Sequence, residues 1–146
     1  MDNQNIAKVG RITNRTSIVV FILTIVTFAA LDIFIVTPWL REVMDSGVLR
    51  SVIMFVVVTF MWVATSAAYD VIGAYANLAL TRSALEGDKE ICAELRREGM
   101  SLDDFMNKNK QDQILLAVSR ILSFWNEAPM AAIAHLVCLA VIRFVM

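Results

Sequence analysis

The feature that most constrains this chain is an apolar run at residues 52–69, which reads VIMFVVVTFMWVATSAAY and contains no charge and no proline. A second apolar run covers residues 17–36 and is interrupted only by Asp32. Runs of this length exceed an ordinary core strand and approach the ~20 residues that a helix needs to cross a bilayer. We therefore expect an all-α integral membrane protein whose apolar helices are surrounded by the lipid bilayer.

Composition limits the remaining possibilities. Hydrophobic residues make up 58% of the 146 residues, and the formal net charge is -1. A chain of this size has room for three spans and one polar loop, but not for a separate soluble domain. Nucleic-acid binding needs a basic face, which this charge balance does not provide, so no nucleic-acid partner is expected.

Polar and apolar segments alternate along the chain. We expect a cytoplasmic N-terminal tail (1–16), a first transmembrane helix (17–40), an external turn (41–50), a second transmembrane helix with a cytoplasmic extension (51–80) and a cytoplasmic helical loop (81–113). The tail has no apolar period and is expected to be frayed or interfacial. Pro38 is expected to end the first helix, because the residue before a proline disfavours helical geometry. In the loop, Gly99 is typical of a helix end, and Ser101 of the next helix start.

Residues 114–146 allow two interpretations. One straight helix would be about 50 Å long, which exceeds the thickness of a bilayer. The sequence NEAP at residues 126–129 offers a break. We expect an interfacial amphipathic helix (114–128), from which Arg120 reaches the headgroups, followed by the third transmembrane helix (129–146). A kinked continuous helix is the alternative.

The distribution of Lys and Arg predicts the orientation. The tail holds three of these residues, the 41–50 turn holds two, and residues 81–112 hold six. With three spans, the tail and the large loop share one side, which then carries nine positive charges against two. This bias predicts a multi-pass protein of the plasma membrane, of the bacterial inner-membrane kind, with a cytoplasmic N-terminus and an external C-terminus.

Four ionisable side chains fall within the expected spans, namely Asp32, Asp70, His135 and Arg143. An ionisable group in hydrocarbon costs about 2.5–3.5 kcal/mol on insertion scales, so each needs a partner or a route to water. The helical rise places Asp32 and Arg143 at about 22 and 21 Å from the cytoplasmic side. We expect them to pair near the outer surface; separate extension of each side chain to the outer headgroups is the alternative.

His135 and Asp70 are both expected near the cytoplasmic third of the bilayer and could approach one another. Such a pair could relay protons or bind a cation, or it could simply join two helices by a hydrogen bond. The sequence contains one histidine, and the methionines are scattered. A transition-metal cage or a bis-histidine haem would need more clustered ligands, so no metal and no cofactor are expected.

Small residues recur at helix-packing spacing in the last two spans. Ala64 and Ala68 are four residues apart and Gly73 follows them, while Ala128 and Ala132 repeat the spacing near the third span. Small side chains let helix backbones approach closely, which is a main source of helix association in membranes. These faces are expected to serve either the intramolecular bundle or a second subunit.

The sequence contains no P-loop, G-x-S-x-G, H-E-x-x-H or C-x-x-C motif, so no enzymatic activity is expected. We expect a small membrane subunit with a structural or assembly role, in a homo-oligomer or with other membrane subunits. The alternative is an oligomeric channel or transporter subunit that conducts ions or protons through Asp70 and His135; a membrane-disrupting effector is a third possibility. The interleaved charges of residues 81–112 are typical of a solvated helix face and could also contact a cytoplasmic partner.

Overall fold

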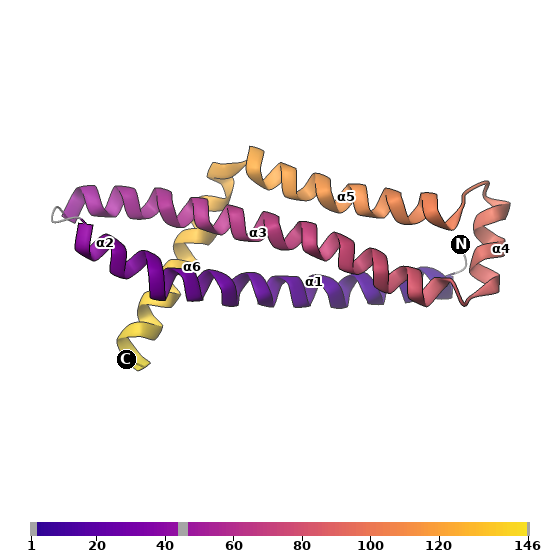
Figure 1. The fold of residues 1–146 in the computed structure, drawn as a ribbon, viewed down its shortest axis with the longest axis horizontal. Coiled ribbons are helices and arrows are strands. Elements are labelled where there is room, and N and C mark those ends of the chain that lie inside the picture. Colours follow the sequence, from indigo (N-terminus) through magenta and orange to yellow (C-terminus); the bar gives the residue numbers. More distant parts are fainter. Residues whose placement is uncertain (1–2, 44–46, 146) are drawn as a thin grey trace.

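The computed structural model describes residues 3–43 and 47–145, and these residues form helices joined by short turns (Figure 1). The elements are α1 (Asn3–Leu31), the π-helical turn η1 (Asp32–Val36), α2 (Thr37–Val43), α3 (Gly47–Leu85), α4 (Lys89–Arg97), α5 (Leu102–Leu122) and α6 (Phe124–Val145). The expected all-α class is confirmed. Residues 44–46, within the expected external turn, and Met146 lie outside the described residues.

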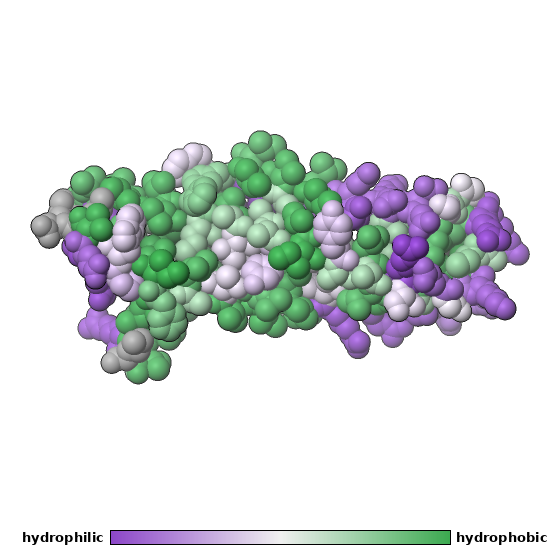
Figure 2. Space-filling view, viewed as in Figure 1, coloured by the Kyte–Doolittle hydropathy of each residue, from purple (hydrophilic) through white to green (hydrophobic). Residues whose placement is uncertain are grey.

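Three helical stretches are long and apolar enough to cross a membrane, as the sequence predicted. They are Ile6–Val43, which runs through α1, η1 and α2, then Gly47–Leu85 and Phe124–Val145. Figure 2 shows a mainly hydrophobic surface over the part that contains α2 and α6, with a small hydrophilic group at its tip, and a mainly hydrophilic surface over the end that contains α4. The bundle is therefore divided along its length into an apolar part and a polar part.

The two longest stretches run antiparallel and lie side by side (Figure 1). α5 returns along the second half of α3, and α6 then crosses the bundle obliquely. The main core lies where α6 crosses, and includes Phe28, Leu40, Val58 and Ala131. A second, smaller core at the polar end packs α4 against its neighbours through Leu85, Ile91, Leu95 and Met106.

The N-terminal segment differs from the sequence prediction, because α1 begins at Asn3 instead of fraying through residue 16. α3 is also longer than a bilayer requires: its 39 residues correspond to about 58 Å, against about 30 Å of hydrocarbon. Both long helices therefore continue from the apolar part into the polar part. The sequence of residues 1–16 gave no apolar period from which this continuation could be predicted.

The prediction that Pro38 ends the first helix is wrong. Thr37 retains helical geometry (φ -63°, ψ -46°), and its backbone N–H donates to the carbonyl of Asp32, five residues earlier. The π turn widens the helix immediately before the proline. A widened turn accommodates a residue that has no N–H to donate and whose ring would crowd the preceding turn. The chain therefore continues as α2 to Val43.

The break expected at residues 126–129 is also misplaced. α5 continues to Leu122, and Ser123 leaves helical geometry (φ -101°, ψ 36°), after which α6 starts at Phe124 in a new direction (Figure 1). Pro129 lies inside α6. Residues 114–122 therefore belong to the long α5 helix that packs on α3. At the other end of α5, the Ser101 side chain accepts a hydrogen bond from the Asp104 N–H at 3.1 Å, and Gly99 before it has φ +73°.

Candidate functional site

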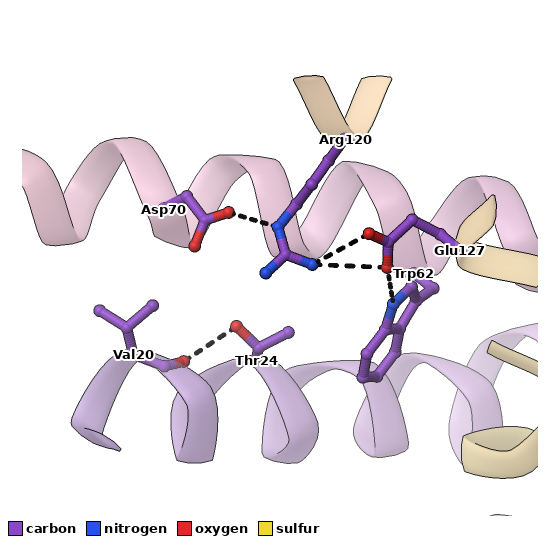
Figure 3. Close-up of polar contacts among 6 residues, drawn as sticks. All are labelled: Val20, Thr24, Trp62, Asp70, Arg120 and Glu127. Carbon is purple, nitrogen blue, oxygen red and sulfur yellow. Dashed lines mark hydrogen bonds and ion pairs between the residues drawn. The ribbon is translucent and has the colours of Figure 1, made fainter. Parts of the chain in front are cut away.

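Arg120 is the centre of a charged cluster between α3, α5 and α6 (Figure 3). Its Nε lies 2.7 Å from Oδ2 of Asp70, and its Nη1 lies 3.3 Å from Oε1 of Glu127. The indole Nε1 of Trp62 donates to Oε2 of Glu127 at 3.1 Å. Two carboxylates therefore share one guanidinium, and the three groups carry a net charge of -1 when all are ionised.

The contact between Asp70 and Arg120 is an ion pair without a directed hydrogen bond. The two atoms are close, but the Nε–H does not point along the line to Oδ2, so both atoms lack a hydrogen-bond partner within the described part of the chain. The Ser66 hydroxyl, one turn before Asp70, has no partner among the described residues either, although Ser66 is only 4% exposed. An unsatisfied buried polar group costs about 1–3 kcal/mol. This part of the bundle thus has unused hydrogen-bonding capacity.

These groups line a cavity of about 640 Å³, which we call the polar cavity. Its walls are α1 and α5, with α3 between them and the first residues of α6 at one end. Its polar lining comprises Thr13, Thr16, Ser17, Thr24, Ser66, Asp70, Asn77, Gln113, Arg120 and Glu127. The volume falls within the range of about 300–1,000 Å³ that small-molecule sites occupy.

A second hollow, which we call the apolar cleft, has a volume of about 290 Å³ and lies between α1 and α6. Its lining includes Phe28, Ile33, Val137 and Val141 and is almost free of polar surface. Phe21, Trp62 and Met130 line both the polar cavity and the apolar cleft. The two hollows are therefore neighbours that meet at these three side chains.

A second buried polar contact lies at the π turn. Oδ2 of Asp32 is 2.6 Å from Nδ1 of His135, and the hydroxyl of Thr37 donates to Oδ1 of Asp32 at 3.3 Å. Asp32 has no exposed surface, and His135 is 9% exposed. The geometry is that of a structural contact that joins η1 to α6.

Two predicted pairings are wrong. Asp32 contacts His135 and Thr37, so it does not pair with Arg143, which is exposed near the end of α6. His135 is therefore bound to Asp32 instead of approaching Asp70, whose partner is Arg120. The depth estimates failed because α6 starts earlier than expected and crosses the bundle obliquely, which shifts its residues relative to the other spans.

Sequence reasoning missed the roles of Arg120, Glu127 and Trp62. Arg120 was interpreted as a side chain that reaches the headgroups, and Glu127 as part of a helix break. The sequence did contain a signal, because Arg120 and Glu127 are the only charged residues between positions 114 and 142 and have opposite signs. Seven residues separate them, which is two helical turns and thus one face, if the helix is continuous.

The predicted packing residues have different environments. A Cβ at Gly73 would lie 2.6 Å from Cγ2 of Val20, so Gly73 marks a close approach of α3 to α1. Ala128 is buried and Ala132 is half-buried within the bundle. Ala64 and Ala68 are exposed on the outer face of α3.

The described residues contain no group of three or more His, Cys, Asp or Glu side chains placed to hold a metal ion. Comparison of the chain with protein-family models, with curated proteins and with solved structures finds no match. Function must therefore be inferred from the arrangement of the residues themselves.

Proposed function

We propose that this chain is a small integral membrane subunit with a structural or assembly role, in a homo-oligomer or together with other membrane subunits. The bilayer would surround the apolar part of the bundle. The N-terminus and the polar end with α4 would be cytoplasmic, and the C-terminus would lie outside. The positive charges of residues 1–16 and 81–112 support this orientation, because basic residues accumulate on the cytoplasmic side of membrane proteins.

The lengths of the helices agree with this placement. From Val48, near the start of α3, to Asp70 is 22 residues, or about 33 Å of helix. This distance is close to the ~30 Å thickness of the hydrocarbon layer. With Val48 at the outer boundary, the charged cluster would lie at the level of the cytoplasmic headgroups, where ionised groups are tolerated.

The outer face of α3 carries the assembly proposal. Every fourth residue along this face is exposed, namely Phe60, Ala64, Ala68, Ile72, Ala76 and Leu80. Ala64 and Ala68 lie at its centre between larger apolar side chains. Because small residues at this spacing let a second helix approach closely, the face is suited to a helix of another subunit.

Disulfide cross-linking in native membranes tests this assignment. A background of Cys92→Ser and Cys138→Ala removes both native thiols, and Ala68→Cys then introduces one thiol on the α3 face. We expect oxidation to give a dimer, or a larger adduct if the neighbour is another protein. Ile133→Cys, exposed on α6, is the matched control and should give far less product. A chain that remains monomeric in mild detergent and gives no adduct at either Ala64→Cys or Ala68→Cys contradicts an assembly role.

The polar end could also receive a cytoplasmic partner. α4 buries Ile91 and Leu95 against the smaller core and exposes Lys89, Glu90 and Arg97. A charged face of this kind is suited to a partner of complementary charge. A variant in which Lys89, Glu90 and Arg97 are replaced by residues of opposite charge should no longer co-purify with such a partner from detergent extracts. The Ala68→Cys adduct should form as before.

The conducting alternative has less geometric support. Asp70 and His135 are held in separate pairs, with Arg120 and with Asp32, and these pairs lie on different parts of the bundle. Proton transfer is better served by a row of titratable side chains, each within reach of the next, than by two separate pairs in which each group is already bound to its partner. Proton flux into liposomes that disappears with Asp70→Asn would favour the alternative.

A further inference from the structure

We propose that the polar cavity and the apolar cleft together bind one phospholipid of the cytoplasmic leaflet, and that its headgroup is a zwitterion with a primary ammonium. The headgroup would occupy the polar cavity beside Arg120, and an acyl chain would occupy the apolar cleft. This inference rests on the proposed membrane location but does not require an oligomer.

The first argument is the order of the two hollows along the bundle. On α1, the polar cavity is lined from Thr13 to Thr24 and the apolar cleft from Phe21 to Ile33. On α6, which crosses the bundle obliquely, the cavity ends at Met130 and the cleft continues beyond it. Polarity therefore falls along one axis, from the headgroup level toward the middle of the bilayer.

The second argument is length. The twelve helical steps from Phe21 to Ile33 correspond to about 18 Å of helix. One leaflet contributes about 15 Å of hydrocarbon, which is half of the whole layer. The apolar cleft is thus long enough for an acyl chain that starts at the cavity and remains within its own leaflet.

The third argument is charge. Arg120 places Nε and Nη1 beside the two carboxylates, and its guanidinium has a third nitrogen, Nη2, that can also donate. Arginine donors and hydroxyls are strong partners for phosphate oxygens, and the unpartnered Ser66 hydroxyl lines the same cavity. Asp70 and Glu127 are acceptors for an ammonium group. A phosphate and an ammonium on one headgroup match this pair of opposite charges.

The same charges discriminate between headgroups. The cluster has a net charge of -1, so a lipid with a net negative charge is repelled. A quaternary ammonium has no N–H to donate to the carboxylates and is usually held by several aromatic rings. The polar cavity has Phe21 and Trp62 in its lining, and the N–H of Trp62 is already directed at Glu127. The primary ammonium is therefore the better partner.

Native mass spectrometry of the full-length, delipidated protein in detergent tests the proposal. The protein is titrated with phosphatidylethanolamine, phosphatidylcholine and phosphatidylglycerol that carry identical acyl chains. We expect one tightly bound lipid, with the ethanolamine headgroup preferred to both others. Equal binding of all three headgroups, or equal binding of the choline and ethanolamine headgroups, overturns the proposal.

Ser66→Ala is the most informative variant, because the Ser66 hydroxyl makes no hydrogen bond to a described residue that the substitution could break. Without lipid, we expect a thermal stability equal to or above that of the unmodified protein, because the substitution removes an unsatisfied buried hydroxyl. We expect about fivefold weaker binding of phosphatidylethanolamine, which corresponds to a hydrogen bond of about 1 kcal/mol. Ser119→Ala, on the exposed face of α5, is the matched control and should bind like the unmodified protein. Unchanged binding by Ser66→Ala overturns the placement of the headgroup.

Two further measurements separate a lipid from its free headgroup. Water-soluble glycerophosphoethanolamine should compete poorly, since it lacks the acyl chains. Ala134→Phe, which places a large side chain in the apolar cleft, should remove most of the advantage of the lipid over this soluble competitor. If glycerophosphoethanolamine competes as strongly as the lipid, or if Ala134→Phe has no effect, the cleft holds no acyl chain. Cross-linking of the Ala68→Cys variant tests the assembly role separately, and its outcome does not depend on these results.

Discussion

Nδ1 of His135 and Oδ2 of Asp32 lie 2.6 Å apart, although 103 residues separate them in the chain. Asp32 is the first residue of the π turn, and Thr37, the residue that follows this turn, donates to its other carboxylate oxygen. The irregular turn and the tertiary contact therefore share one side chain. His135 thereby joins the last long helix to the first at the point where the first helix changes its geometry.

Replacement of Asp32 by alanine should destabilise the bundle, because it removes the partner of His135 and the acceptor of Thr37. Polar contacts between membrane helices contribute about 0.6 kcal/mol on average and up to ~1.7. We expect a loss of about 1–2 kcal/mol for Asp32→Ala, since two contacts are lost, and a smaller loss for Asp32→Asn. Thermal unfolding in detergent, followed by circular dichroism, measures both.

Arg143→Ala is the control for this prediction, because Arg143 is exposed on the same helix as His135. It should leave the stability nearly unchanged. The charge exchange Asp32→Arg with Arg143→Asp should be no more stable than Asp32→Arg alone. Recovery of stability in the double variant would mean that Asp32 pairs with Arg143 after all.

Arg120→Gln should be more damaging than the loss of either carboxylate. It leaves both Asp70 and Glu127 without their shared cation, whereas Glu127→Gln still leaves Arg120 paired with Asp70. Breaking a buried ion pair by removal of one partner costs about 3–5 kcal/mol, and partial exposure of this cluster should place the loss below that range. Thermal unfolding of Arg120→Gln, Asp70→Asn and the double variant gives the coupling energy, for which we expect about 0.5–3 kcal/mol. Strictly additive losses would exclude a direct interaction.

Trp62→Phe isolates the hydrogen bond between the indole and Glu127. The phenyl ring retains most of the edge-to-face contact with Phe28, whose ring centroid is 5.1 Å from that of Trp62. The lost hydrogen bond to a charged acceptor should reduce stability by about 1.5–3 kcal/mol. Trp125→Phe, at a position that is 64% exposed, is the matched control and should change stability far less. Equal effects in the two variants would show that the bond to Glu127 contributes nothing.

The coarse fold could be predicted from the sequence because hydrophobicity along the chain is a local property. The apolar run at residues 52–69 identifies a helix in α3 without knowledge of any other residue. Helix ends depend on more than local sequence. Pro38 disfavours helix locally, but the π turn before it removes the conflict, and that turn is held by Asp32 and its distant partner.

The candidate site was predicted in part, since Asp70 was singled out as a polar group that needs an explanation. Its partner could not be found by depth alone, because depth estimates assume straight helices that start at the membrane surface. α5 instead returns along α3, which brings Arg120 beside Asp70, and Ser123 redirects the chain so that Glu127 reaches the same cluster. Three-way contacts of this kind follow from helix directions, which one sequence does not specify.

Gly73 provides a test of the packing between the two longest helices. A Cβ at this position would lie 2.6 Å from Cγ2 of Val20, and the branched valine side chain cannot easily rotate away. Gly73→Ala should therefore destabilise the bundle by about 1–3 kcal/mol through overpacking, although alanine is the better helix former. Val20→Ala should restore much of this loss in the double variant, because it removes the atom that is contacted. Gly10→Ala is the matched control in α1, where the added methyl group meets no atom within 4 Å; there we expect a gain of about 0.5–1 kcal/mol from helix propensity. A stabilising effect of both glycine substitutions in thermal unfolding would contradict the close approach of α1 and α3.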